Sequence, residues 1–156
     1  MTLEMFVPAW KPVASLEVEG VPVPQGSLQA YPVGRPPYVR CVIPQDRKVR
    51  AWRDVIAQIA TAEQFGRNRG VFVESGPLCM VCRFVLPRPK SASKSKSGAA
   101  LAAKRPDLDK LTRAIGDALE GIWYKEDSQI VEGVQSKRVA EPGIGPGVTI
   151  TLYKVQ

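Results

Sequence analysis

The sequence predicts a single α+β domain with a mixed β-sheet and two helices packed on one face. Three observations support this fold class. The chain has 156 residues, which is the size of one domain around one hydrophobic core. Two segments carry apolar residues at helical spacing, and the segments around them show the alternating or continuous apolar pattern of strands. Their order is strand, strand, helix, strand, helix, strand, strand (β-β-α-β-α-β-β).

The part of the chain before the first helix contains two predicted strands. We expect residues 1–14 to form a loosely held N-terminal arm, so that the domain covers residues 15–156. Ser15–Glu19 alternates apolar and polar residues and predicts a strand, and Tyr38–Ile43 predicts a second one. The proline-rich segment between them, Tyr31–Pro37, is interpreted as a rigid connector.

A long helix and a central strand follow. The helix is predicted over Asp46–Phe65, because apolar residues recur there every three or four positions and Gly66 is a plausible stop. Pro77–Leu86 is apolar on both faces and predicts a strand in the middle of the sheet. Cys79 and Cys82 have the spacing of a metal-binding pair, but the chain offers no second pair of ligands, so we interpret them as core residues.

A basic loop is predicted at residues 87–106, where the sequence has no acidic residue. Its cations are Arg88, Lys90, Lys94, Lys96, Lys104 and Arg105. A loop of this length inside a compact domain is usually functional or disordered. We interpret it as a DNA-binding surface that contacts phosphates without reading base sequence, since it leads directly into an acidic segment. The alternative is a solvated loop without a partner.

The acidic segment begins with a second predicted helix. Asp107 and Asp109 stand at its start, with Asp109 as the expected N-cap, and its apolar residues recur at helical spacing. A strand predicted over Ser128–Val139 follows closely and would bring Asp127 back to the same place. Three converging carboxylates favour a site for Mg²⁺, or Mn²⁺ as a substitute, with positions left for water and phosphate. A last strand is expected over Val148–Val155.

The same aspartates have a plainer interpretation. Asp at a helix start is a common cap, and Asp109, Arg113 and Asp117 recur every fourth residue as they would in a solvated ladder of charges. The dense grouping of acidic residues beside the basic loop favours the functional interpretation.

The run RPDLDKLTRAIGDALEGIWYKEDSQIVE, residues 105–132, resembles the signature of the RusA family of Holliday-junction resolvases. That signature has an Asp-Leu-Asp-Asn helix start, a later Asp-Ala-Leu, and an acidic pair followed by Ser-Gln. The resemblance implies a RusA-like, Mg²⁺-dependent endodeoxyribonuclease that acts as a homodimer on four-way junctions in recombination and repair. By position it assigns the metal-binding aspartates to Asp107, Asp109 and Asp127, and the Asp-Ala-Leu to Asp117–Leu119.

The chain departs from this signature at three positions. Lys110 stands where the family commonly has Asn, Arg113 replaces a functional Lys, and Glu126 replaces the first Asp of the acidic pair. Arginine does not release its proton in proteins, so we assign Arg113 the role of stabilising phosphate charge, with Lys110 in support as a further DNA contact. Asp117 and Glu126 are interpreted as supporting residues.

Composition narrows the chemistry further. The formal charge of +7 favours a polyanionic partner such as nucleic acid. The sequence has no histidine, which excludes Ser-His and Cys-His nucleophilic catalysis, so hydrolysis would rest on carboxylates and a metal ion. The three cysteines suit a reducing compartment, and we see no signal peptide or membrane-spanning segment. We therefore expect a cytoplasmic protein in a bacterial or phage-infected cell, with no membrane contact.

Two other functions fit parts of the pattern. A non-catalytic protein that binds branched DNA would explain Lys110 and Arg113 as departures that weaken chemistry. A metal-dependent phosphohydrolase acting on nucleotides would use the same carboxylates, but a small substrate does not require so extended a basic loop.

Overall fold

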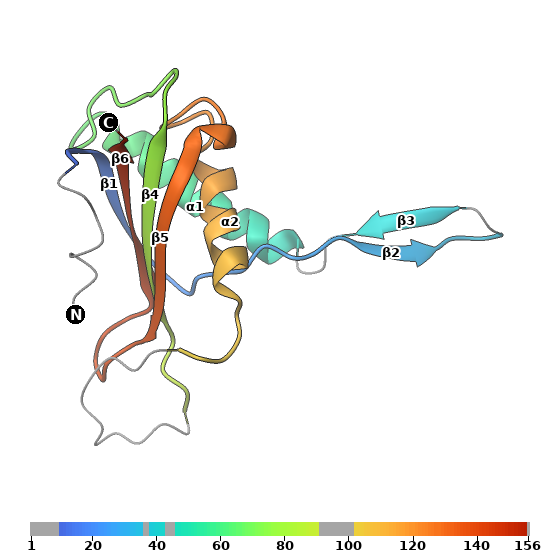
Figure 1. The fold of residues 1–156 in the computed structure, drawn as a ribbon. Coiled ribbons are helices and arrows are strands. Elements are labelled where there is room, and N and C mark those ends of the chain that lie inside the picture. The colour runs from blue at the N-terminus through green and yellow to red at the C-terminus, as the bar shows by residue number, and fades with distance from the viewer. Residues whose placement is uncertain (1–9, 36–37, 43–45, 91–101, 156) are drawn as a thin grey trace.

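The computed structural model describes residues 10–35, 38–42, 46–90 and 102–155. Its centre is a four-stranded mixed sheet with the strand order β1-β6-β4-β5. These strands are β1 (Pro12–Glu19), β4 (Leu78–Leu86), β5 (Ile130–Val139) and β6 (Gly147–Lys154). β4 pairs parallel with β5 and antiparallel with β6, and β6 pairs antiparallel with β1 (Figure 1).

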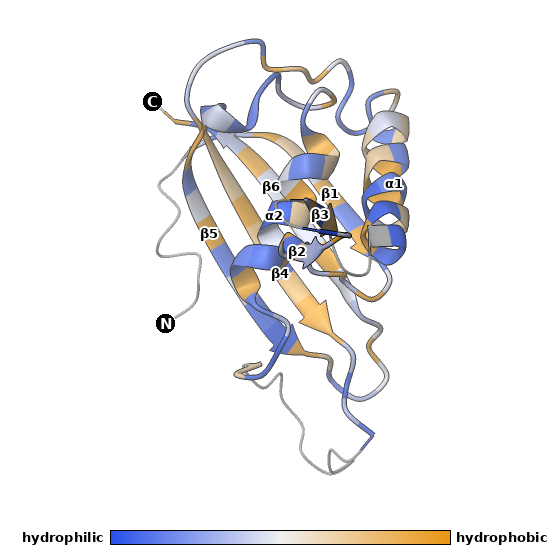
Figure 2. Ribbon diagram, turned by 90° about the vertical axis from the view of Figure 1, so that its right-hand side faces the viewer, coloured by the Kyte–Doolittle hydropathy of each residue, from blue (hydrophilic) through white to orange (hydrophobic). Residues whose placement is uncertain are grey.

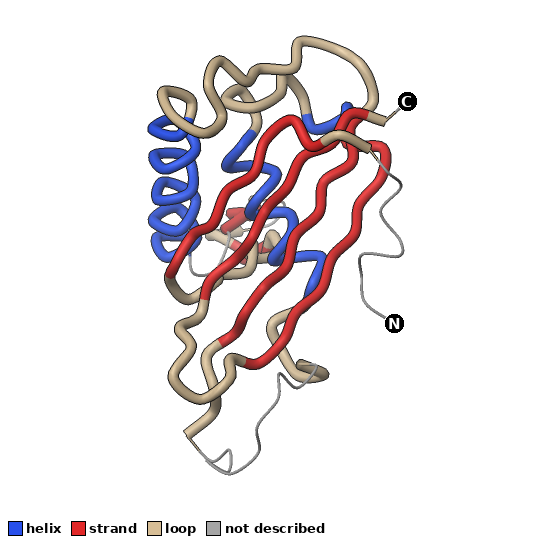
Figure 3. Tube along the Cα trace, turned by 90° about the vertical axis from the view of Figure 1, so that its left-hand side faces the viewer, coloured by secondary structure: helices blue, strands red, loops and turns tan. Residues whose placement is uncertain are grey.

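Two helices, α1 (Asp46–Glu63) and α2 (Leu108–Leu119), cover one face of this sheet. They lie together on one side in Figure 1, and Figure 3 shows the opposite face with the strands in front. α1 packs beside β1, α2 packs beside β5, and the two helices contact each other. The α+β fold class and the placement of both helices on one face are therefore confirmed.

The hydrophobic core lies between the sheet and the helices. Alternate residues of β4 are buried against the helices, because side chains along a strand point to opposite faces. Figure 2 shows the apolar stretch of β4 and the alternation of hydrophilic and hydrophobic residues along α1. Cys79 and Cys82 are both buried and unpaired, which agrees with their interpretation as core residues. Burial raises the pKa of Cys82 to about 12, so this thiol keeps its proton.

The two elements before α1 differ from the prediction. β2 (Gln29–Pro32) and β3 (Val39–Val42) form a separate antiparallel hairpin and do not join the main sheet. The predicted connector Tyr31–Pro37 thus begins inside a strand, and the chain has one strand more than expected before its first helix. Proline is compatible with β2 because an edge strand leaves one row of N–H groups unpaired.

Some element boundaries also differ. β1 begins at Pro12 rather than Ser15, so the last residues assigned to the N-terminal arm belong to the sheet, while residues 1–9 lie outside the described part. α2 begins at Leu108 with Asp107 as N-cap, so the prediction that Asp109 is the cap was wrong. The reason is that the Asp107 carbonyl already accepts the N–H of Leu111 at 3.2 Å. In the described residues, no helix has the length and hydrophobicity needed to cross a membrane.

Candidate active site

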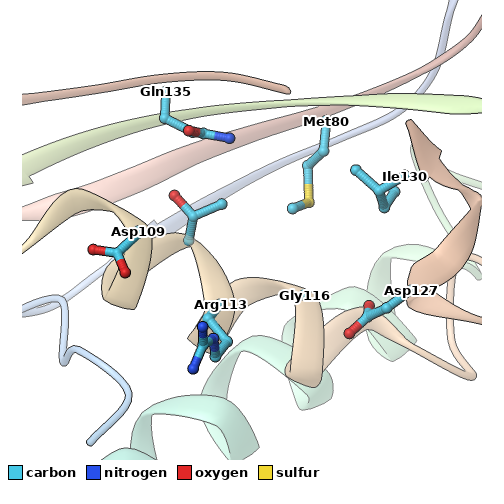
Figure 4. Close-up of a pocket in the computed structure, with 8 residues that line it drawn as sticks. Met80, Asp109, Arg113, Gly116, Asp127, Ile130 and Gln135 are labelled. Carbon is cyan, nitrogen blue, oxygen red and sulfur yellow. The ribbon is translucent and has the colours of Figure 1, made fainter. Parts of the chain in front are cut away.

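A cavity of about 280 Å³ lies where α2 faces β4 and the start of β5. It is lined by Met80, Asp109, Thr112, Arg113, Gly116, Asp127, Ile130 and Gln135. Figure 4 shows Asp109 and Asp127 toward opposite ends of this cavity, with Arg113 and Gly116 between them along α2. The lining therefore combines apolar side chains, such as Met80 and Ile130, with the charged side chains of α2 and Asp127.

The helix α2 supplies one wall of the cavity. Thr112 and Arg113 follow Asp109 by three and four residues, and Gly116 follows them by four and three, a spacing that places all four on one face of a helix. The residues between them, including Leu111 and Ile115, are fully buried in the core. Because the core holds one face of α2, the other face is presented to the cavity in a fixed orientation.

Asp127 is positioned by a tight turn. Residues Asp127–Gln129 form a 3₁₀ turn, and the side chain of Gln129 organises it. Its Oε1 accepts the backbone N–H groups of Lys125 and Glu126 at 2.9 and 3.0 Å, and its Nε2 donates to the carbonyl of Val73 at 3.2 Å. Glu126 completes a reciprocal capping box with Gln129, so Glu126 supports the turn.

Tyr124 contacts Asp127 through its side-chain hydroxyl. This buried hydroxyl lies 3.0 Å from Oδ1 of Asp127 and 3.0 Å from the carbonyl oxygen of Gly116, so its single proton is shared between these two acceptors. Burial is the main cause that raises the pKa of Tyr124, and the charge of Asp127 adds to it. The hydroxyl therefore stays protonated and remains a donor to the carboxylate.

The turn lies directly against α2 at Gly116. A Cβ at this position would lie 3.4 Å from Oδ1 of Asp127, which is an ordinary van der Waals contact, so the carboxylate of Asp127 rests beside the helix backbone. Sequence reasoning did not identify Tyr124, Gly116, Thr112 or Gln135 as site residues. No sequence signal separates Tyr124 from an ordinary core aromatic, because its role depends on where the turn packs.

Asp107 is placed differently from the other two predicted metal ligands. Its backbone is extended at the helix start, and its carboxylate lies 3.5 Å from Nζ of Lys110. It does not line the cavity. The structure thus brings Asp109, Asp127 and Arg113 to one cavity and places Asp107 and Lys110 beside it.

The donor atoms of the cavity are suited to a magnesium ion. Among the residues that the structure describes, no three acidic or cysteine side chains gather closely enough to enclose a metal. Mg²⁺, however, keeps several waters and is commonly held by one or two carboxylates together with substrate phosphates. Asp109 and Asp127 offer two such carboxylates, and Thr112 and Gln135 add neutral oxygens. The residue types therefore fit the ion. Because Asp109 and Asp127 lie toward opposite ends of the cavity, an ion held by both would reach at least one of them through water or phosphate.

Asp117 lies outside the cavity. Its carboxylate lies 3.4 Å from Nη1 of Arg53, and Nη2 of the same guanidinium donates to its backbone carbonyl at 3.4 Å. This contact joins α1 to α2, so the supporting role that Asp117 has in the structure is to hold the two helices together.

The described ends of the basic loop are held on the body of the protein. Arg88 donates to the carbonyl of Ala140 at 3.3 Å, while Lys90, Lys104 and Arg105 are exposed. Nζ of Lys137 donates to the carbonyls of Lys104 and Pro106, both at 2.7 Å, and so fixes the entry to α2. Lys137 was not identified from sequence. Lys94 and Lys96 lie outside the described residues.

Comparison with known proteins gives two matches. The sequence model of the family described as "Endodeoxyribonuclease RusA" matches residues 19–153. An uncharacterized protein of Bacillus subtilis (strain 168), YqaN, is 30% identical over 115 residues, which is 69% of this chain and 75% of that protein. The family match includes the whole main sheet except the first strand, both helices and every residue that lines the cavity. The chain therefore belongs to the RusA endodeoxyribonuclease family.

Proposed function

We propose that this protein is a metal-dependent endodeoxyribonuclease that resolves Holliday junctions and other branched DNA by phosphodiester hydrolysis. The observation that supports this most is the placement of Asp109, Arg113 and Asp127 around one open cavity, in a chain of the RusA family with a formal charge of +7. Carboxylates and an arginine around a cavity provide oxygen ligands for a cation and a permanent charge for a phosphate.

In this proposal Asp109 and Asp127 hold Mg²⁺, with Mn²⁺ as a possible substitute. When bound there, the ion supplies a Lewis acid that lowers the pKa of a bound water and offsets phosphate charge. Arg113 binds the scissile phosphate and stabilises the extra charge of the transition state, because a guanidinium keeps its charge. Tyr124 orients Asp127 through its hydroxyl. We assign Asp107 as a third ligand, a role that requires its ion pair with Lys110 to open.

The basic loop is proposed as the main contact to the phosphate backbone. Lys90, Lys104 and Arg105 are exposed at its two described ends. Lys94 and Lys96, together with Arg88 and Lys110, extend the same basic surface in the proposal. We assign the loop to residues 87–106. The domain expected at residues 15–156 is extended to Pro12, because β1 begins there. The setting proposed is the cytoplasm of a bacterial or phage-infected cell.

We further propose that the protein acts as a homodimer. Resolution of a four-way junction needs two cuts in strands of like polarity. A two-fold dimer presents two identical sites to a substrate with approximate two-fold symmetry.

A non-catalytic protein that binds branched DNA is the second candidate. The observation that favours it is the ion pair between Asp107 and Lys110, which occupies one of the three expected ligands. Such a protein would bind junctions with the same affinity whether or not Asp109 is present, and it would cut none of them.

Cleavage of an end-labelled four-way junction, beside a linear duplex of the same sequence, distinguishes these functions. We expect paired, symmetric nicks in the junction alone, which require Mg²⁺ and stop on addition of EDTA. Asp109→Asn should bind the junction but not cut it, whereas Glu17→Gln should cut normally, because Glu17 is exposed on β1 at the edge of the sheet opposite β5. Tight binding without nicks, under both Mg²⁺ and Mn²⁺, would support the non-catalytic candidate instead.

A further inference from the structure

The β2–β3 hairpin projects away from the body of the protein (Figure 1). All residues of both strands are exposed, and the hairpin forms a sheet of its own. Among the described residues, six of the twelve large apolar side chains that are exposed lie on it or beside it. They are Leu28, Tyr31, Val33, Tyr38, Val39 and Val42. Such a concentration of apolar surface on a protruding ribbon indicates a binding surface.

The pairing of the two strands assigns these side chains to faces. Tyr31 is paired with Arg40, and the N–H of Val33 donates to the carbonyl of Tyr38 at 3.1 Å. Because side chains alternate between faces, Tyr31, Tyr38 and Arg40 share one face of the ribbon, and Val39 lies on the other. Tyr31 is 49% exposed and Tyr38 is 71% exposed. Tyr31 and Tyr38 are diagonal neighbours, about 7 Å apart, and the Tyr31 hydroxyl donates to Oε1 of Gln29 on the same face, so both rings offer a surface on which a base can stack.

The charge of the hairpin favours a polyanion as its partner. Between residues 20 and 45 the sequence has no acidic residue, and the cations there are Arg35 and Arg40. Two hairpins packed against each other would bring these arginines together without a carboxylate of the hairpin to offset them. Aromatic rings next to arginine and far from carboxylates are the residues on which nucleic-acid bases stack.

The hairpin is also tied to the candidate active site. The backbone N–H of Gln25, on the segment leading into β2, donates to the carbonyl of Lys110 in the first turn of α2 at 2.9 Å. Lys110 follows Asp109 directly. Figure 2 shows the hairpin extending from the same side of the sheet as α2. DNA whose phosphate lies at the cavity would therefore meet the hairpin on its path.

We propose that the face formed by Tyr31, Tyr38 and Arg40 stacks on unpaired or unstacked bases at the branch point of DNA. This inference rests on the proposed nuclease function. It adds the structural feature of the DNA substrate that the protein recognises, the exposed bases at the branch point. Bases at a branch point are accessible, whereas bases within a linear duplex must first be unstacked at an energetic cost. The hairpin thereby provides a preference for branched over linear DNA, and the basic residues provide affinity for both.

The test uses a four-way junction with 2-aminopurine at the crossover and a linear duplex of the same sequence, both in EDTA. Wild type is compared with Tyr31→Ala/Tyr38→Ala and, as a matched control on the other face, with Val39→Ala. We expect the double variant to bind the junction roughly five- to hundredfold more weakly, as expected for the loss of one stacked base. Its affinity for the duplex should not change, and the 2-aminopurine emission change seen with wild type should disappear. Val39→Ala should match wild type.

Three results would overturn this inference. The first is an unchanged affinity of the double variant for the junction, and the second is an equal loss of affinity for junction and duplex. The third is a lower mass of the double variant in sedimentation, which would show that the hairpin joins two copies of the chain. Circular dichroism verifies that the exposed substitutions leave the fold intact. The proposed nuclease function fails separately, if wild type neither binds nor cuts the junction. If wild type cuts junctions and the hairpin variants behave like it, only the hairpin inference fails.

Discussion

Tyr124 connects the fold to the chemistry at the scale of one residue. Its hydroxyl donates to Asp127 from a fully buried position. Tyr124→Phe keeps the ring and removes this donor, so Asp127 loses the contact that orients it. We expect both Mn²⁺ affinity and junction cleavage to fall about 10- to 100-fold, the usual effect of losing such a supporting contact. Tyr153→Phe on β6 is the matched control. If Tyr124→Phe has a lower melting temperature but binds Mn²⁺ normally, the hydroxyl only stabilises the fold.

Cys82 makes the folded state sensitive to alkali. Burial, with a smaller effect of Cys79, raises the pKa of Cys82 from 9.0 to about 12. Between these values the unfolded thiol releases its proton and the folded one keeps it, so the free energy of unfolding falls by up to about 1.4 kcal/mol per pH unit. The stabilisation is complete below about pH 9 and is lost as the pH rises toward 12.

The free energy of unfolding of Cys82→Ala should therefore fall less than that of wild type as the pH rises. At neutral pH the variant is less stable than wild type, because the smaller side chain leaves a cavity in the core. Urea unfolding across the alkaline range measures this slope. Cys41→Ala removes an exposed thiol and should follow wild type. Parallel slopes for Cys82→Ala and wild type would contradict the argument, since Tyr124 remains in both and adds the same alkaline loss.

At the scale of elements, Lys137 fixes the segment that leads from the basic loop into α2. It donates hydrogen bonds to the carbonyls of Lys104 and Pro106. Because the donor is charged, these bonds are stronger than hydrogen bonds between neutral groups. Lys137→Met removes both while keeping the aliphatic stem. We expect faster backbone hydrogen exchange at residues 102–108 and slower junction cleavage. Lys154→Met, an exposed lysine on β6, serves as the control, and equal exchange in the two variants would refute this role.

The elements that the sequence predicted well are those whose burial leaves a strong pattern. In α1, Trp52, Ile56 and Ala60 recur at helical spacing and are buried. The first half of β4, residues 78–82, is buried on both faces as its continuous apolar run predicts, whereas Arg83 is exposed. The start of α2 was less certain, because Asp107 and Asp109 are both good caps and the choice depends on the backbone before them. β3 agrees with the strand predicted at Tyr38–Ile43, but β2 and its pairing with β3 were missed, because prolines interrupt the alternation and neither strand packs on the core.

The same distinction holds for the candidate site. Asp109, Arg113 and Asp127, which line the cavity, could be selected from the sequence as candidates because charged side chains in a motif stand out. Gly116 and Tyr124 could not, since their roles arise only when the turn at Asp127 packs on α2. The position of Asp107 beside the cavity also depends on a contact, its ion pair with Lys110, that spacing along the chain does not determine.

At the scale of the whole molecule, the parallel pairing of β4 and β5 brings the site together. Parallel neighbours need a crossover, and here the crossover carries the basic loop and α2 from the end of β4 back to the start of β5. The turn at Asp127, which directly precedes β5, therefore lies beside α2. The basic loop, the charged face of α2 and Asp127 thus belong to one continuous connection.

The central claim is that Asp109 and Asp127 together form one metal-binding site. The most direct test is Mn²⁺ binding followed by electron paramagnetic resonance, with the nicked product of a junction present. We predict that Asp109→Asn and Asp127→Asn each weaken Mn²⁺ binding about tenfold or more. Asp117→Asn, which removes a carboxylate of the same helix outside the cavity, should bind Mn²⁺ like wild type. Equal affinity in all three variants would contradict the claim.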